Sequence, residues 1–95
     1  MARRRYLVAY DIRDDRRLRQ VASCMEGFGE RLQYSVFVCD LSAQEFVEMR
    51  ADVESRMKPS EDSVMVVDLG RTDDANRFLF LGQHEDLPDD QAIIV

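Results

Sequence analysis

Two almost uninterrupted apolar runs, Tyr6–Tyr10 and Val64–Val67, constrain the fold of this chain more than any other feature. Such runs are typical of strands that are buried on both faces, because a strand with one wet face alternates polar and apolar residues. The chain has 95 residues, which is enough for a single domain. Its own helices or a second molecule must therefore cover both faces of a small sheet.

Two segments with helical spacing separate the strand-like runs. Apolar residues recur every three or four positions over 18–28, and Asp14 or Asp15 can cap the start of this helix. Gly27 and Gly29 stand where it should end, because glycine accepts the left-handed conformation that is common there. A second helix begins at a capping box and ends before a proline. Its cap and its apolar face comprise Ser42, Glu45, Phe46, Met49, Val53 and Met57.

The remaining segments complete an α+β pattern. Residues 31–39 form either one strand or two short strands that bend near 34–35. Residues 63–69 form another strand, and 77–81 form a further one. This order predicts a ferredoxin-like βαββαβ fold with an additional C-terminal strand and with two helices on one face of an antiparallel sheet.

A single ferredoxin-like domain over 1–95 is expected, in which 76–95 form the C-terminal strand and tail. The two helices leave the other face of the sheet uncovered, although its strands are apolar on both sides. A second copy of the chain can cover that face, so we expect a homodimer that packs sheet to sheet.

The composition is that of a soluble globular protein, with 45% apolar and 34% charged residues. No apolar run approaches the roughly 20 residues of a membrane span, and the N-terminal residues lack the apolar stretch of a signal peptide. We therefore expect a cytoplasmic protein with no membrane partner. Cys24 and Cys39 are isolated and His84 has no cysteine near it, so a zinc site is not expected.

Charge is distributed unevenly along the chain. The net charge is −6, yet residues 1–31 carry eight arginines against five acidic residues. Arginine suits bidentate contacts with phosphate, so this segment either binds nucleic acid or forms a solvated, salt-bridged face. The arginines near the first helix are Arg13, Arg16, Arg17 and Arg19. Three aromatic residues can stack on bases or belong to the core, namely Tyr10, Tyr34 and Phe37.

Residues 5–12 are predicted to form one central strand, and Asp11 interrupts its apolar pattern near the C-terminal end. A carboxylate in a buried strand is costly unless it is paired, hydrogen-bonded or bound to a cation. It is either a cap or turn aspartate, or a metal ligand. One carboxylate is too few for magnesium, but two copies facing each other across a two-fold axis, with water and substrate phosphate, would suffice. Such a metal could activate water for attack on a phosphodiester.

Two blocks of the sequence, 6–17 and 29–37, resemble the CRISPR-associated Cas2 family. They read Tyr-Leu-Val-Ala-Tyr-Asp-Ile-Arg-Asp-Asp-Arg-Arg and Gly-Glu-Arg-Leu-Gln-Tyr-Ser-Val-Phe, in the order and spacing of that family. The resemblance implies a ferredoxin-like homodimer in which the two copies of Asp11 share Mg²⁺ or Mn²⁺. It also implies endonuclease action on RNA or DNA phosphodiesters, and bridging of Cas1 integrase dimers during spacer acquisition. Further residues that it marks as nucleic-acid or active-site residues are Arg31, Ser35 and Phe37.

Three functional hypotheses follow. The first is a metal-dependent endonuclease of the spacer-acquisition machinery, with Asp11 as the catalytic residue. The second is a non-catalytic adaptor for Cas1 and DNA, because Val38 stands where the family often has an acidic residue. The third is a ferredoxin-like regulatory module that binds a small ligand. In each case the segments 77–81 and 92–95 either pair with a partner protomer or with Cas1, or form a frayed tail.

Overall fold

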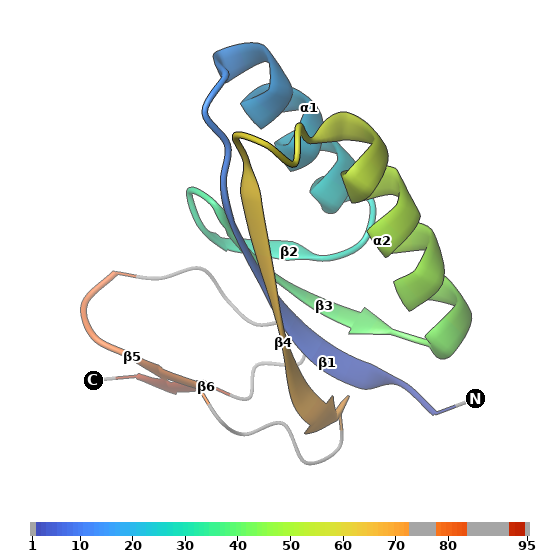
Figure 1. Ribbon diagram of the computed structural model, residues 1–95. Coiled ribbons are helices and arrows are strands. Elements are labelled where there is room, and N and C mark those ends of the chain that lie inside the picture. The colour runs from blue at the N-terminus through green and yellow to red at the C-terminus, as the bar shows by residue number, and fades with distance from the viewer. Residues whose placement is uncertain (1, 73–77, 84–91, 95) are drawn as a thin grey trace.

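The first six elements of the chain follow the predicted order β-α-β-β-α-β. The computed structural model describes residues 2–72, 78–83 and 92–94 (Figure 1). The elements are β1 Arg4–Asp11, α1 Asp15–Glu26, β2 Glu30–Gln33, β3 Val36–Leu41, α2 Ala43–Arg56, β4 Ser63–Arg71, β5 Phe78–Phe80 and β6 Ala92–Ile94. The segment 31–39 thus contributes to two strands joined by a tight turn at Tyr34 and Ser35, which is one of the two predicted alternatives.

Four strands form one sheet in the order β2-β3-β1-β4, and every neighbouring pair is antiparallel. Both helices lie on the same face of this sheet (Figure 1). Each helix connects two parallel strands that have a third strand between them, which is the ferredoxin-like arrangement. The structure therefore confirms the predicted fold. It also brings the end of β1, the start of α1 and the start of β4 to the same edge of the molecule.

The main core lies between the helices and the sheet. Val8 of β1 and Val21 and Met25 of α1 are fully buried. The predicted apolar face of α2 is confirmed, since its members are buried in this core or pack against it: Phe46, Met49, Val53 and Met57. Cys39 lies in the same core and Cys24 at its margin, both as free thiols. Burial raises the pKa of Cys39 to about 12, so its thiol stays protonated.

The C-terminal region covers part of the second face of the sheet. Phe78 and Phe80 of β5 pack against Leu32 and Val38 there. β5 pairs in parallel with β6 as a separate two-stranded sheet (Figure 1). The expected single additional strand is therefore a pair of strands that contact each other, an outcome that neither alternative for the tail included. Of the predicted tail, residues 76–77, 84–91 and 95 lie outside the described residues.

The helix starts follow local sequence signals. The Asp14 carboxylate caps α1 by accepting a hydrogen bond of 2.9 Å from the backbone N–H of Arg17. The capping box between Ser42 and Glu45 is present at the start of α2. Gly27 ends α1 with a φ of −78°, so the left-handed conformation expected there is not adopted. No helix in the described part of the chain is long and apolar enough to cross a membrane.

Gly29 is needed for space and not for an unusual backbone conformation. A β-carbon at this position would collide with the backbone oxygen of Val38 and would lie 2.6 Å from Sγ of Cys39. The connection from α1 to β2 therefore passes directly against β3, where only a hydrogen atom fits.

Candidate nucleic-acid and metal site

Asp11 ends β1 on the surface of the molecule. Its side chain is 72% exposed, and its Oδ2 lies 3.9 Å from Nη2 of Arg13. The burial cost expected for a carboxylate in this strand does not arise, because the strand ends here opposite Ser63. Among the described residues, no three histidine, cysteine or acidic side chains come together to hold a metal ion. One protomer thus offers Asp11 as a single oxygen ligand that solvent and substrates can reach.

Asp62 is a buried carboxylate that organises the surroundings of Asp11. It accepts a hydrogen bond of 3.0 Å from the backbone N–H of Arg13 and one of 2.8 Å from that of Lys58. The guanidinium of Arg17 donates two more, of 2.8 Å from Nε and 3.1 Å from Nη2. These hydrogen bonds, with Arg17 the largest contributor, hold the pKa of Asp62 well below its usual range. The loop after Asp11 is thereby fastened to the end of α2.

Arg17 belongs to this scaffold. Besides Asp62 it contacts Glu61 at 2.9 Å, and only 22% of its side chain is exposed. Its carboxylate partners raise the pKa of the guanidinium, which stays charged and engaged. Arg17 therefore holds the scaffold through Nε and Nη2, and its expected contact with phosphate stays a prediction.

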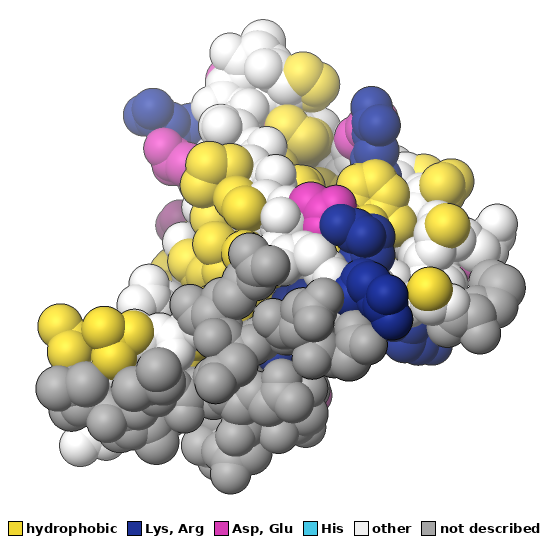
Figure 2. All heavy atoms as spheres, turned by 90° about the horizontal axis from the view of Figure 1, so that it is seen from below, with side chains coloured by type: hydrophobic (Ala, Val, Ile, Leu, Met, Phe, Trp, Pro, Cys, Tyr) yellow, Lys and Arg dark blue, Asp and Glu magenta, His cyan; other side chains and the backbone are white. Residues whose placement is uncertain are grey.

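Three other arginines of the basic segment are also neutralised. Arg3 pairs with Glu45 at 2.6 Å, and Arg4 pairs with Asp68 at 3.0 Å. Arg5 is fully buried and donates two hydrogen bonds to the carboxylate of its cross-strand neighbour Asp40, at 2.7 and 2.8 Å. Figure 2 shows basic side chains directly beside acidic ones on the face seen from below. These arginines hold the N-terminal end of the sheet together.

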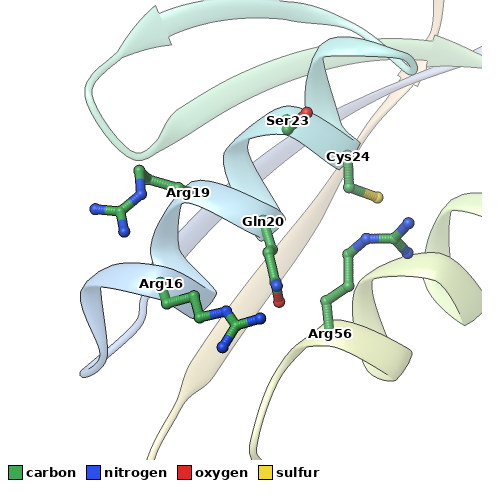
Figure 3. A pocket seen from close by; sticks show the side chains of 6 residues that line it. All are labelled: Arg16, Arg19, Gln20, Ser23, Cys24 and Arg56. Carbon is green, nitrogen blue, oxygen red and sulfur yellow. The ribbon is translucent and has the colours of Figure 1, made fainter.

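Arg16 and Arg19 remain without carboxylate partners in the part of the chain that the structure describes. They line an open groove of about 410 Å³ that runs beside α1, together with Gln20, Ser23, Cys24 and Arg56. In Figure 3, Arg16 and Gln20 point from α1 toward Arg56 of α2, whereas Arg19 points to the opposite side of α1. No acidic side chain lines this groove in the described residues, although Arg56 pairs with Asp52 at 3.5 Å, and its lining therefore favours anions over cations.

The second predicted cluster divides into exposed and buried members. Arg31 is exposed, and its guanidinium carbon lies 6.0 Å from the ring centre of Tyr34 and 5.2 Å from that of Phe37. Phe37 is fully buried and stacks with buried Tyr10, so the prediction that Phe37 meets a base directly is corrected. Phe37 instead supports Arg31. Ser35 is half-buried, and its backbone oxygen accepts a hydrogen bond of 3.0 Å from Tyr10.

Sequence reasoning did not assign a role to Asp62 and left Tyr34 undecided. Asp62 follows a proline turn and resembles any surface acid, since its main partner Arg17 is 45 positions away. Tyr34 is 74% exposed at the tip of the β2–β3 hairpin. The bend near 34–35 was the available signal for that exposure, because a side chain in a tight turn has few neighbours to cover it.

The sheet order and the helices on one face define a ferredoxin-like α+β domain, with an exposed carboxylate before its first helix and, within the described residues, two arginines on that helix without carboxylate partners. The family model described as CRISPR associated protein Cas2 matches residues 4–77, and this chain belongs to that family.

Relatives and solved structures agree with this assignment. A CRISPR-associated endoribonuclease Cas2 from Rhodospirillum rubrum is 37% identical over 91 residues, which are 95% of this chain and 89% of that protein. Another from Synechocystis sp. is 46% identical over 59 residues, which are 62% of this chain and 64%, just under two thirds, of that relative. Streptococcus pyogenes Cas2 has a TM-score of 0.62 and 31% identity, covering 66% of this chain and 82% of its own. A hypothetical protein from Thermus thermophilus has a TM-score of 0.68 and 33% identity, and the match covers 70% of this chain and 80% of that protein.

Proposed function

We propose that this chain is a nucleic-acid-binding subunit of the CRISPR spacer-acquisition machinery. The observation that carries the proposal is the set of arginines without carboxylate partners among the described residues, on a chain whose net charge is −6. These residues are Arg16, Arg19 and Arg31. Unneutralised arginines produce a local positive potential that attracts phosphate even when the whole chain is acidic. Membership of the Cas2 family supports RNA or DNA as the ligand and Cas1 integrase dimers as the partners that the subunit bridges.

The proposed catalytic form is a homodimer in which the two Asp11 carboxylates share Mg²⁺ or Mn²⁺. Exposure of Asp11 supports this arrangement, since a carboxylate oxygen is a ligand that these ions accept. The bound ion would polarise the scissile phosphate and activate water. Arg13, 69% exposed and close to Asp11, would bind a phosphate oxygen, and Asp62 holds the backbone of Arg13 in place. The relatives named endoribonucleases support hydrolysis of a phosphodiester as the reaction.

A non-catalytic adaptor for Cas1 and DNA is the second candidate function. Val38 favours it, because this fully buried side chain belongs to the apolar cluster on the second face, at a position that is often acidic in the family. A second carboxylate near Asp11 is therefore not supplied by that position. The two candidates share nucleic-acid binding and differ in hydrolysis.

Binding and cleavage of the same labelled strand separate these functions. Replacing both Arg16 and Arg19 with alanine should weaken binding at low salt and reduce the slope of log affinity against log salt by about 1 to 2. Asp11→Asn should retain binding and lower the rate of Mg²⁺-dependent cleavage by about 100-fold or more. Fluorescence anisotropy measures the first quantity, and gel analysis of products measures the second.

Two control variants are matched to these changes. Asp15→Asn removes an exposed acid at the start of α1, and Arg50→Ala removes an arginine that pairs with Glu54 on α2. Asp15→Asn should cleave the strand as the unchanged protein does, and Arg50→Ala should bind it as the unchanged protein does. Binding without cleavage by the unchanged protein would favour the adaptor. Absence of any nucleic-acid binding at low salt would refute both candidates and favour the regulatory module.

A further inference from the structure

The tip of the β2–β3 hairpin presents an aromatic ring that is mostly exposed. Tyr34 is 74% exposed, more than any other large hydrophobic side chain in the described residues. Single exposed apolar side chains are common on protein surfaces, so the groups around Tyr34 decide whether its ring belongs to a binding site. The other two aromatic candidates, Tyr10 and Phe37, are buried and cannot serve in its place.

Tyr34 forms one wall of an open cleft between the hairpin and α1. The cleft has a volume of about 300 Å³, which reaches the range of pockets that hold small ligands. It is lined by Tyr34, Leu18, Arg19, Ala22, Ser23, Glu26 and Arg31. Two cations thus stand beside one exposed ring, with Glu26 as the acidic member of the lining.

Arg31 is held in position by aromatic rings. Its guanidinium carbon lies 5.2 Å from the ring centre of buried Phe37 and 6.0 Å from that of Tyr34, distances at which a cation is attracted to a ring face. No carboxylate pairs with Arg31 or Arg19 in the described ranges. Both guanidinium groups therefore keep their donors available for an incoming anion.

A ring and two guanidinium groups together match the parts of a nucleotide. Phosphate accepts hydrogen bonds from arginine, and a base has a flat face that stacks on tyrosine. In a duplex that face is covered by the neighbouring base pairs, so only an unpaired base can stack on a side chain. We propose that this cleft binds one unpaired nucleotide, with its base on Tyr34 and its flanking phosphates on Arg19 and Arg31. The inference rests on the proposed nucleic-acid binding and names the residue that contacts the base.

Affinity for a single-stranded oligodeoxythymidylate of about twelve nucleotides, and for its duplex, tests the inference. Tyr34→Ala should weaken single-strand binding by about 5- to 150-fold, the loss that corresponds to one base–aromatic stack. Tyr34→Phe should keep the affinity, because its ring still stacks. Duplex binding should be the same for all three proteins. A strand of equal length made of abasic nucleotides should bind more weakly and should not respond to Tyr34→Ala.

The control is Val47→Ala, which shortens another exposed apolar side chain, on α2. It should leave every affinity unchanged. The inference would be overturned if Tyr34→Ala and the unchanged protein bound the single strand equally well. In that case, loss of binding in the Arg16 and Arg19 double variant would still support the proposed function. If neither strand nor duplex binds at low salt, both proposals fail together.

Discussion

At the scale of single residues, the charge of Asp62 stabilises the loop between Asp11 and α1. Its carboxylate accepts hydrogen bonds from the backbone of Arg13 and Lys58 and from the side chain of Arg17, and it is fully buried. A buried carboxylate with an arginine partner is tolerated only while both are present, since removal of one leaves an uncompensated charge. The loop between Asp11 and α1 therefore depends on a residue that does not itself touch the candidate ligands.

Asp62→Asn should lower the thermal unfolding midpoint at pH 7 by more than about 5 °C. The folded-state pKa of Asp62 lies below its ordinary value of 3.8, so this carboxylate stabilises the fold above that value and loses the effect as pH falls through the folded pKa. As the pH falls from about 4 toward the folded pKa, the unchanged protein should therefore lose stability more steeply than Asp62→Asn. Thermal unfolding followed by circular dichroism at several pH values measures both effects.

The comparison for this prediction is Asp15→Asn, which removes an exposed acid outside the Asp62 network. Its acid-dependent loss of stability should follow that of the unchanged protein. Parallel pH profiles for the unchanged protein and Asp62→Asn would contradict the role assigned to Asp62.

At the scale of elements, the sequence predicted where the two helices begin, because residues close in the chain determine these positions. Asp14 and the Ser42–Glu45 box fall at helix starts because their hydrogen-bond partners lie within three residues. The position where α1 ends was also predicted, but the reason given for Gly27 was wrong. The close contact of Gly29 with β3 and the pairing of Asp62 were beyond prediction, because both depend on elements that are distant in the chain.

Gly29→Ala should lower the free energy of unfolding by about 1–3 kcal/mol or more, because the added methyl group meets the backbone of β3 and Sγ of Cys39. Gly27→Ala is the matched control. Its β-carbon would lie 3.4 Å from the backbone oxygen of Cys24, and its φ of −78° suits alanine. Its effect should stay within about 0.5 kcal/mol. Urea denaturation of both variants decides the matter, and equal stabilities would rule out the steric explanation.

At the scale of the whole molecule, the second face of the sheet is only partly covered. Phe78 and Phe80 cover Leu32 and Val38, whereas Met65 of β4 remains 56% exposed. Met65 lies opposite Ala9 in the register, and both alternate with residues that face the helices. The free part of this face is where a second protomer is expected to pack.

Sedimentation at micromolar concentration should give about twice the chain mass of 11.1 kDa. Met65→Glu should shift the protein toward monomer, because it places a charge on the free part of the second face. Val47→Glu makes the same change at a side chain that is 62% exposed on α2, and it should leave the mass unchanged. A monomeric mass for the unchanged protein would exclude the homodimer at that concentration.

The central position of β1 has a consequence for biosynthesis. β1 leaves the ribosome before α1, and both of its neighbours, β3 and β4, are synthesised later. In the sheet, Asp11 lies opposite Ser63 of β4. The residue before Ser63 is Asp62, whose carboxylate accepts a hydrogen bond from the backbone of Arg13 in the loop after β1. A nascent chain that stops before β4 contains Asp11 and the arginines of α1 but cannot hold them in their native arrangement. We therefore expect a chain that ends before β4 to lack the native arrangement around Asp11, which forms only after β4 has been synthesised.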